Sequence, residues 1–321
     1  MSSQPPPGEL FAPIEPYASG MLDVSDGNSI YWETCGNPRG KPALIVHGGP
    51  GIGCTERMRR AFDPERYRIV LFDQRGAGRS RPHASEASTD MRCNTTHHLI
   101  ADMERLREHL DIESWVLSAG SWGVTLAVAY AERFPQRVLA MVLANVSLSR
   151  RREIDWLYRD VARFFPEEWQ LFSEGVPEAE RGDLVAAYAR AMEQPDRREL
   201  AANRWARWED AVVSLEPNAK PSVYSDRPPA ALIAFVRICA HYFANAAWLE
   251  DDELLRNATR LRNIPGVVIH GRLDLSCPII SAWELVRAWP RAAFHPISNG
   301  GHQGNVALRT LMLQAHAEFG G

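Results

Sequence analysis

Residues 119–123 read Ala-Gly-Ser-Trp-Gly and place a serine where it could act as a nucleophile. A strand-like run at 115–118 precedes them and a helix-like run at 124–133 follows. A serine on a sharp turn between a strand and a helix, flanked by small residues, is typical of a nucleophile elbow. The usual pattern begins with glycine, and here the small methyl group of Ala119 takes that place. The pattern predicts that Ser121 lies at a helix N-terminus, where backbone N–H groups stabilise developing negative charge.

An acid and a base follow Ser121 in the chain. Residues 267–271 form a short apolar strand-like run, and Asp274 comes soon after its end. His302 lies in the glycine-rich stretch at 299–303. Each residue alone is more often a satisfied polar residue in a loop. The order nucleophile, acid, base, with a strand before each residue, instead indicates the triad of an α/β hydrolase.

A second glycine-rich loop follows the apolar run at 43–46 and reads His-Gly-Gly-Pro-Gly over residues 47–51. In α/β hydrolases a loop at this place supplies a backbone N–H to the oxyanion that forms during acyl transfer. The sequence therefore contains, in order, an oxyanion loop, a nucleophile, an acid and a base.

Strands and helices that could position these residues alternate along the chain. The expected strands lie at 43–46, 68–72, 115–118, 139–144, 266–270 and 292–297, and the expected helices at 97–110, 122–133, 279–289 and 305–318. A turn signal, Asp-Gly-Asn at 26–28, predicts an opening hairpin within 21–33. The alternation predicts an α/β fold, with a mostly parallel sheet flanked by helices.

The strand signal vanishes between about 147 and 258, where Trp, Arg, Glu and Ala recur at helical spacing. We expect this stretch to be an all-helical cap inserted into the fold. The predicted organisation is a first part of the hydrolase core at 1–146, the cap at 147–258 and a second part of the core at 259–321. Most cap aromatics are expected to pack in its interior. A cap above the serine would exclude water and select the substrate.

Composition excludes several classes of partner. The 321 residues carry a formal net charge of −4 without long basic runs, which argues against nucleic acid. Five cysteines without C-x-x-C spacing argue against a zinc knuckle or a disulfide scaffold and fit a reducing compartment. The N-terminal residues lack the features of a secretory signal, and the apolar run at 230–240 is interrupted by Arg237. We expect a cytoplasmic protein that does not enter membranes, and the sequence leaves monomer and homo-oligomer equally open.

Over nearly its whole length the chain resembles the proline iminopeptidases, peptidase family S33 of the α/β-hydrolase superfamily. The motifs that carry the resemblance are His47-Gly48-Gly49-Pro50-Gly51, Asp73-Gln74-Arg75-Gly76-Ala77-Gly78-Arg79-Ser80-Arg81-Pro82, Asn94-Thr95-Thr96, Gly120-Ser121-Trp122-Gly123, Trp205-Ala206-Arg207-Trp208-Glu209, His241-Tyr242-Phe243, His270-Gly271-Arg272-Leu273-Asp274 and Gly301-His302. Together they are far more specific than the pattern of a generic serine hydrolase.

The resemblance implies a role for each residue of the expected triad. Ser121 would attack the scissile carbonyl, His302 would carry its proton to the leaving amine, and Asp274 would orient the imidazole. The N–H groups of Gly49 and Trp122 would bind the oxyanion, a contribution of ~3 kcal/mol per donor. The family needs no metal and no organic cofactor.

The family removes an N-terminal residue, usually proline, and holds its protonated amine with carboxylates of the cap. Glu209, at the end of the Trp-x-x-Trp-Glu motif, matches one of them, although by itself it would be read as a surface glutamate. The second lies in the family pattern Arg-Ile-Glu-Asn-His-Tyr-Phe, and here that position is Cys239. The loss of one anionic partner removes contacts worth ~1.5–3 kcal/mol.

The expected substrate wall also differs after the strand at 139–144. Where the family tends to read Leu-Arg-Gly-Ile-Phe, this chain has Ala144 and Ser147 in place of the arginine and the aromatic. A tyrosine of the family appears as Leu157. The leading hypothesis is cleavage after an N-terminal proline-like residue. The alternatives are a different small amide or ester substrate, and a ligand-binding protein without catalysis.

Overall fold

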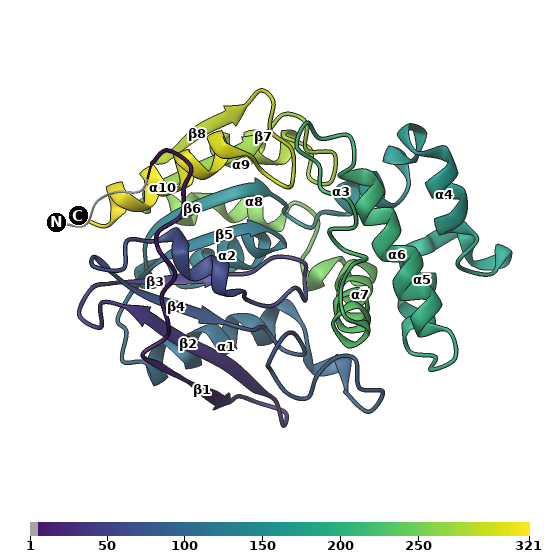
Figure 1. The fold of residues 1–321 in the computed structure, drawn as a ribbon, viewed down its shortest axis with the longest axis horizontal. Helices are drawn as coiled ribbons and strands as arrows, with labels where there is room; N and C mark the ends of the chain where they lie inside the picture. Colours follow the sequence, from purple (N-terminus) through teal and green to yellow (C-terminus); the bar gives the residue numbers. More distant parts are fainter. Residues whose placement is uncertain (1–5) are drawn as a thin grey trace.

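A twisted sheet of eight strands crosses the molecule in this computed structural model, which describes residues 6–321 (Figure 1). The expectation of no secretory signal rests partly on residues 1–5, which lie outside the described part. The strands are β1 (Ala18–Asp23), β2 (Ser29–Gly36), β3 (Lys41–Val46), β4 (Tyr67–Phe72), β5 (Trp115–Ser121), β6 (Val138–Val146), β7 (Gly266–Gly271) and β8 (Ala292–Ile297).

The strand order is β1-β2-β4-β3-β5-β6-β7-β8, and every pairing from β4 to β8 is parallel. The first two strands form the antiparallel hairpin that was expected around residues 26–28. Because parallel strands end at the same edge, the segments that follow β3, β5, β7 and β8 converge there. The predicted α/β-hydrolase fold is confirmed.

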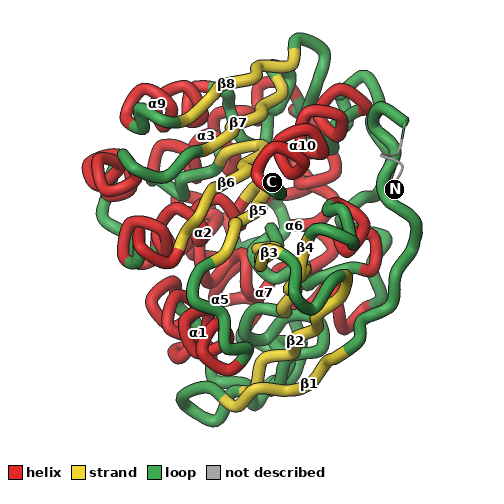
Figure 2. The backbone as a smooth tube through the Cα atoms, turned by 90° about the vertical axis from the view of Figure 1, so that its left-hand side faces the viewer, coloured by secondary structure: helices red, strands yellow, loops and turns green. Residues whose placement is uncertain are grey.

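Helices cover both faces of the sheet (Figure 2). On one face lie α1 (Thr96–His109), α2 (Trp122–Arg133), α8 (Glu253–Asn257) and α9 (Ile280–Ala288). On the other lie α10 (Val306–Phe319) and the short 3₁₀ helix η1 (Glu56–Ala61). This two-sided cover explains why the central strands are apolar runs without alternation.

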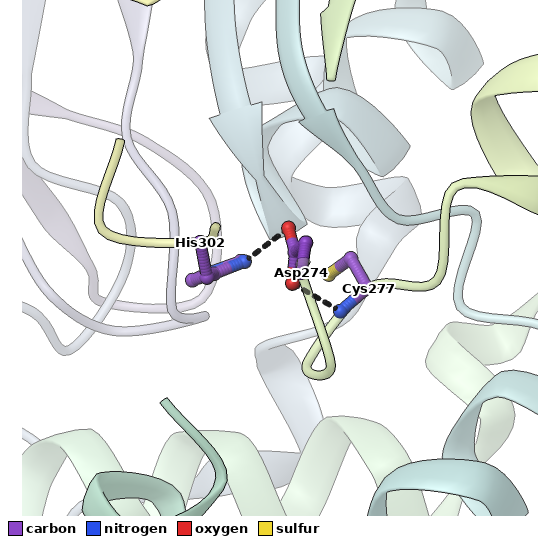
Figure 3. A group of neighbouring side chains, drawn as sticks. All are labelled: Asp274, Cys277 and His302. Atoms are coloured by element: carbon purple, nitrogen blue, oxygen red, sulfur yellow. Dashed lines mark hydrogen bonds and ion pairs between the residues drawn. The ribbon is translucent and has the colours of Figure 1, made fainter. Parts of the chain in front are cut away.

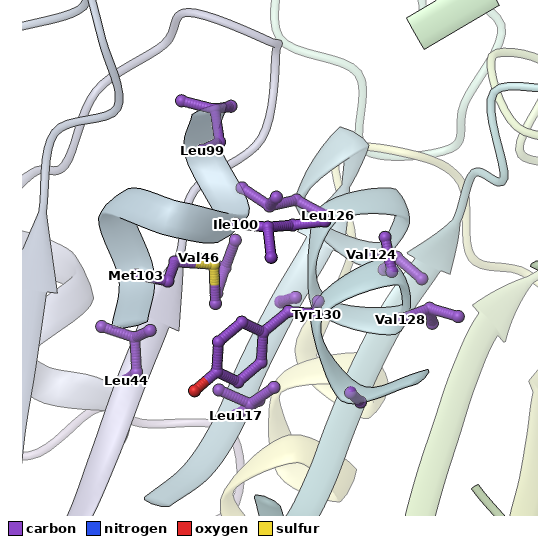
Figure 4. Close-up of a cluster of buried hydrophobic side chains, with 14 of the residues drawn as sticks. Leu44, Val46, Leu99, Ile100, Met103, Leu117, Val124, Leu126, Val128 and Tyr130 are labelled. Atoms are coloured by element: carbon purple, nitrogen blue, oxygen red, sulfur yellow. The ribbon is translucent and has the colours of Figure 1, made fainter. Parts of the chain in front are cut away.

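The hydrophobic core shows how successive strand residues serve the two faces. Leu44 and Val46 of β3 pack with Leu117 of β5 against α1 and α2 (Figure 4). Ala43 and Ile45, which alternate with them, belong to a second cluster on the opposite face. Each fully buried Leu, Val or Ile side chain contributes about 1.5–3 kcal/mol. The two clusters hold the sheet rigidly beneath the loops at its carboxyl edge.

Between β6 and β7 the described chain contains no strand and is helical, as the sequence indicated. Its main helices are α3 (Arg151–Tyr158), α4 (Pro166–Ser173), α5 (Leu184–Met192), α6 (Arg198–Val212) and α7 (Pro229–Ala244). They gather at one end of the molecule (Figure 1) around their own cluster, in which Phe172 stacks on Tyr188 and Trp208 with ring centroids 4.6 and 5.5 Å away. The boundaries of the cap stay a prediction.

Membrane-spanning length is not reached by any single helix within residues 6–321. One consecutive pair of helices, Pro229–Ala244 and Ala246–Leu261, is long and apolar enough for a span only when the two are taken together. The chain bends by 72° between them.

Candidate active site

Ser121 lies where β5 ends and α2 begins, with a backbone φ of 56° and ψ of −132°. A positive φ is uncommon for residues other than glycine and is a known feature of functional turns. A Cβ on Gly123 would overlap the carbonyl oxygen of Val46, so glycine is required there. Ala119 is buried without such a conflict. The strand, turn and helix expected around Ser121 are all present.

Asp274 and His302 lie on the loops after β7 and β8, and their side chains meet (Figure 3). His302 Nδ1 lies 2.9 Å from Asp274 Oδ2, and Asp274 Oδ1 accepts a hydrogen bond of 2.8 Å from the backbone N–H of Cys277. Since a carboxylate only accepts, Nδ1 carries the proton and Nε2 is left as the basic nitrogen.

The electrostatics of His302 follow from this pairing. Burial by itself lowers the pKa of His302, but the interactions with its neighbours, of which the one with Asp274 is the largest, together outweigh burial, and the pKa lies well above its usual value. Asp274, Cys277 and His302 also place potential metal ligand atoms within 4.8 Å of one another. However, both carboxylate oxygens already accept hydrogen bonds, and burial raises the pKa of Cys277 to about 11, which keeps its thiol protonated. The cluster therefore fits an acid–base pair better than a metal site.

Ser121 and His302 line one cavity between the sheet and the helical cluster. No hydrogen bond joins their side chains in the described chain, and such contacts are often long without substrate. Its other lining residues include Gly49, Trp122, Leu157, Tyr158, Glu209, Phe235 and Phe243. The cavity thus needs both the core and the helices at 147–258.

The glycine-rich loop after β3, the expected oxyanion loop, is held by a hydrogen-bonded histidine. Gly49 has a φ of 115°, and a Cβ there would approach the backbone nitrogen of Gly51 to 2.7 Å. His47 Nδ1 lies 3.0 Å from the carbonyl of Gly48, while its Nε2 accepts from the backbone N–H of Gln74 at 2.9 Å. Burial lowers the pKa of His47, which keeps the ring neutral. His47 therefore supports the loop and stands apart from proton transfer.

Gln74 joins the two segments that carry the expected oxyanion donors. Its side-chain amide donates to the carbonyl of His47 at 2.8 Å and accepts from Trp122 Nε1 at 3.1 Å. Gln74 is 2% exposed, and sequence reasoning gave it no separate role. The sequence indicated Gln74 only through its place in the motif at 73–82, and its hydrogen-bond partners are known only from the fold.

Ion pairs with buried carboxylates anchor the rest of that motif. Arg75 donates to both oxygens of Asp102 at 2.7 and 2.8 Å. Asp73 accepts from the backbone N–H of Cys54 at 2.6 Å and from Arg79 Nε at 2.8 Å. Loss of one partner would leave a buried charge unpaired, which is costly. These contacts fix the loop after β4 against α1 and against Cys54, which follows the glycine-rich loop at 47–51.

Glu209 of α6 brings a carboxylate to the cap side of the cavity. It is 6% exposed, and its Oε1 accepts from Tyr158 Oη at 2.5 Å and Trp205 Nε1 at 3.2 Å. No hydrogen bond from the described residues reaches Oε2. Burial raises the pKa of Glu209, and the hydrogen bonds from Tyr158 and Trp205 oppose that rise. A cation in the cavity would find an oxygen without a partner.

The other expected substrate residues are divided among different places. Ser147 and Leu157 line the cavity with Glu209. Ala144 does not; it lies on the face of the sheet that α10 covers. Cys239 is fully buried in α7, where its thiol donates to the carbonyl of Pro50 at 3.2 Å. Cys239 therefore contacts the oxyanion loop from behind and is absent from the described lining of the cavity.

Two residues that sequence reasoning missed hold the loop of His302. Glu216, 7% exposed, accepts from the backbone N–H groups of His302 and Gln303 at 2.5 and 2.9 Å. Asn145 donates through Nδ2 to the carbonyl of His302 at 2.7 Å. A Cβ on Gly301 would overlap Glu216, so the close approach needs glycine. Nothing local in the sequence could indicate contacts across such separations.

Comparisons with known proteins agree with this architecture. The family model described as "alpha/beta hydrolase fold" matches residues 41–306. A proline iminopeptidase of Xylella fastidiosa (strain Temecula1 / ATCC 700964) is 45% identical over 91% of this chain and 93% of its own. One of Arabidopsis thaliana is 44% identical over 92% of this chain and 78% of its own. The structure of a proline iminopeptidase-related protein from Thermus thermophilus aligns with a TM-score of 0.56 and 22% identity, covering 94% of this chain and 96% of that one, and it supports the fold alone.

Proposed function

Because the chain belongs to the proline iminopeptidase family of α/β hydrolases, we propose that it hydrolyses the amide bond after an N-terminal proline through an acyl-serine intermediate. A different amide or ester substrate and a role without catalysis are not favoured, since relatives that match over most of the chain bear the iminopeptidase name. The observation that carries the proposal is the buried carboxylate of Glu209 in the same cavity as Ser121 and His302.

Acylation would begin with Ser121. Its Oγ attacks the scissile carbonyl while His302 Nε2 takes the hydroxyl proton, and Asp274 stabilises the resulting imidazolium. The carbonyl oxygen becomes an oxyanion that accepts from the N–H groups of Gly49 and Trp122. Trp122 is the first residue of α2, so its N–H has no partner within the helix. His302 then gives its proton to the leaving nitrogen, and the C–N bond breaks.

Deacylation repeats the sequence with water. His302 takes a proton from a water molecule, whose oxygen attacks the prolyl ester carbon. The tetrahedral intermediate uses the same two N–H donors, and its collapse breaks the bond to Ser121 Oγ, which recovers the proton. Free proline leaves, and the enzyme is unchanged.

Glu209 would select substrates with a free N-terminal amine. The prolyl secondary ammonium carries two N–H groups and one positive charge, and a desolvated cation needs an opposite charge. Oε1 is occupied by Tyr158 and Trp205, which leaves Oε2 for the ammonium. Much of the remaining lining of the cavity is apolar, and Phe235, Phe243 and Leu157 would contact the pyrrolidine ring of the proline.

A comparison of proline p-nitroanilide with N-acetyl-proline p-nitroanilide tests this function. We expect strong preference for the free amine, and we expect Glu209→Gln to lower its kcat/KM by about 10- to 100-fold, since hydrogen bonds to charged groups are worth ~1.5–3 kcal/mol. Glu167→Gln, on the exposed side of α4, is the matched control. Hydrolysis of p-nitrophenyl acetate reports whether the triad of the variant is intact. Equal turnover of the two anilides, or unchanged preference in Glu209→Gln, would overturn the proposal.

We further propose that the substrate is a small peptide or amide met in the cytoplasm, away from nucleic acids and membranes. The absence of long basic runs and the five unpaired cysteines of the described chain support this. Cell fractionation with activity assays of each fraction tests it, and the recovery of activity in the membrane pellet would contradict it.

A further inference from the structure

A second hollow opens on Ser121, on the face of the sheet that carries η1 and α10. Its floor is formed by Ser121, Ala144 and neighbouring residues of β5 and β6. One wall includes Ile52 and Met58, and the other Leu308 and Met312. We call this hollow the leaving-side groove. It shares Ile52, Ser121 and His302 with the cavity that contains Glu209.

The lining of the leaving-side groove is largely apolar. It contains no Asp, Glu, Lys or Arg within the described chain, whereas the other cavity contains Glu209 and Glu153. Methionine side chains face it from both walls, and these adapt to different apolar shapes. The hollow exists partly because Ala144 ends at a methyl group on the floor. The two hollows that meet at the nucleophile therefore differ in chemistry.

The reaction demands two such surfaces. The acyl group and its ammonium occupy the cavity of Glu209, whereas the leaving nitrogen must lie beside His302, which protonates it. The chain beyond that nitrogen has to continue along a surface that touches both Ser121 and His302 and lies outside the acyl cavity. The leaving-side groove meets these conditions.

We propose that the leaving-side groove binds the residue that follows the N-terminal proline, and that it selects a neutral apolar side chain there. This inference rests on the proposed function. A carboxylate or ammonium in the groove would lose its hydration without an opposite charge to replace it. An apolar side chain would gain by the burial of its surface against Met58, Leu308 and Met312.

A series of dipeptide amides tests the selection. We expect kcat/KM for Pro-Leu-NH₂ to exceed the values for Pro-Glu-NH₂ and Pro-Lys-NH₂ by at least about tenfold, with amides used so that no terminal carboxylate intervenes. Met312→Lys places a cation in the groove, so it should raise the ratio of kcat/KM for Pro-Glu-NH₂ to kcat/KM for Pro-Lys-NH₂ by about tenfold. Gln314→Lys adds the same charge to an exposed part of α10 outside the groove and should leave the ratio unchanged.

The opposite wall provides a second variant. If Met312→Lys fails to fold by circular dichroism, Met58→Lys makes the same test from η1. Release of proline from all three amides at equal rates, with kcat/KM ratios that neither lysine variant shifts, would overturn the proposed selection by the groove. The iminopeptidase function would still stand. If none of the amides or the free-amine anilide is cleaved while the ester is, the proposed function itself fails.

Discussion

His302 can act as a base only in its neutral form, and its surroundings favour the charged one. His302 Nδ1 lies 2.9 Å from Asp274, and the negative charge of Asp274 is the largest of the interactions that together outweigh the effect of burial on the pKa of His302. The same contact that orients the imidazole therefore moves its titration toward alkaline pH. At the residue scale, a well-oriented base comes with a restricted pH range.

We predict that kcat/KM for proline p-nitroanilide rises with pH, with the midpoint of its acid limb above about 6.5, the ordinary value for histidine. Asp274→Asn should lower kcat by about 10⁴-fold and move the limb to lower pH, because the charge that holds the proton is gone. A pH–rate profile of both proteins measures this. A limb at or below pH 6 in the wild-type enzyme would show that burial outweighs the interactions that favour the charged imidazole.

At the scale of elements, several helices begin and end where local signals placed them. The helix expected at 122–133 is α2, and the one expected at 305–318 is α10, displaced by one residue. Asn305 caps α10 by accepting from the backbone N–H of Leu308 at 2.9 Å. The loop of His302 immediately precedes this cap and depends on the segment after α6, through Glu216.

Glu216→Gln should reduce kcat by about 10- to 100-fold with little change in KM. A glutamine oxygen can satisfy only one of the two N–H groups that Glu216 accepts, and an unpaired buried donor costs about 1–3 kcal/mol. Because Glu216 would act through His302, it is a positioning residue, and the effect should appear on esters and anilides alike. Steady-state kinetics on both substrates measures it, with Glu178→Gln in the exposed cap as control. A rise in KM alone would assign Glu216 to substrate binding.

On the scale of the whole molecule, one buried histidine joins three elements behind the site. His316 of α10 lies 2.8 Å from the carbonyl of Ala61 in η1 and 3.0 Å from the hydroxyl of Ser118 in β5. Its ring stacks on Phe62 with centroids 3.9 Å apart. Burial lowers the pKa of His316 to about 4. The walls of the leaving-side groove are thus tied together by a neutral imidazole.

This histidine should make the free energy of unfolding fall on acidification. Between its ordinary pKa near 6.5 and the folded value of about 4, the unfolded chain binds a proton that the native protein does not, so stability drops as pH falls through this window. The full effect is about 3 kcal/mol, from 1.36 kcal/mol per pKa unit. Urea unfolding of wild type and His316→Gln at pH 7 and pH 4.5 measures it. The free energy of unfolding of the variant relative to that of wild type should be higher at pH 4.5 than at pH 7. A difference that does not change with pH would contradict the assignment.

The sequence by itself determined the fold class, the elbow at Ser121 and the chain order of acid and base. These depend on local signals, namely apolar runs, glycine positions and caps. Such signals act over a few residues and have the same effect in the folded protein. Family motifs added the expectation for Glu209, which the structure places in the cavity with Ser121.

Only the tertiary structure decided what surrounds those residues. Tyr158 reaches Glu209 across 51 positions, Glu216 reaches His302 across 86, and Cys239 faces Pro50 instead of the cavity. The separation of Ala144 from Ser147 on two sides of the site has the same origin. Such contacts arise where helices pack on a finished sheet, and packing depends on the shape of every neighbour at once, so no local pattern in the chain encodes them.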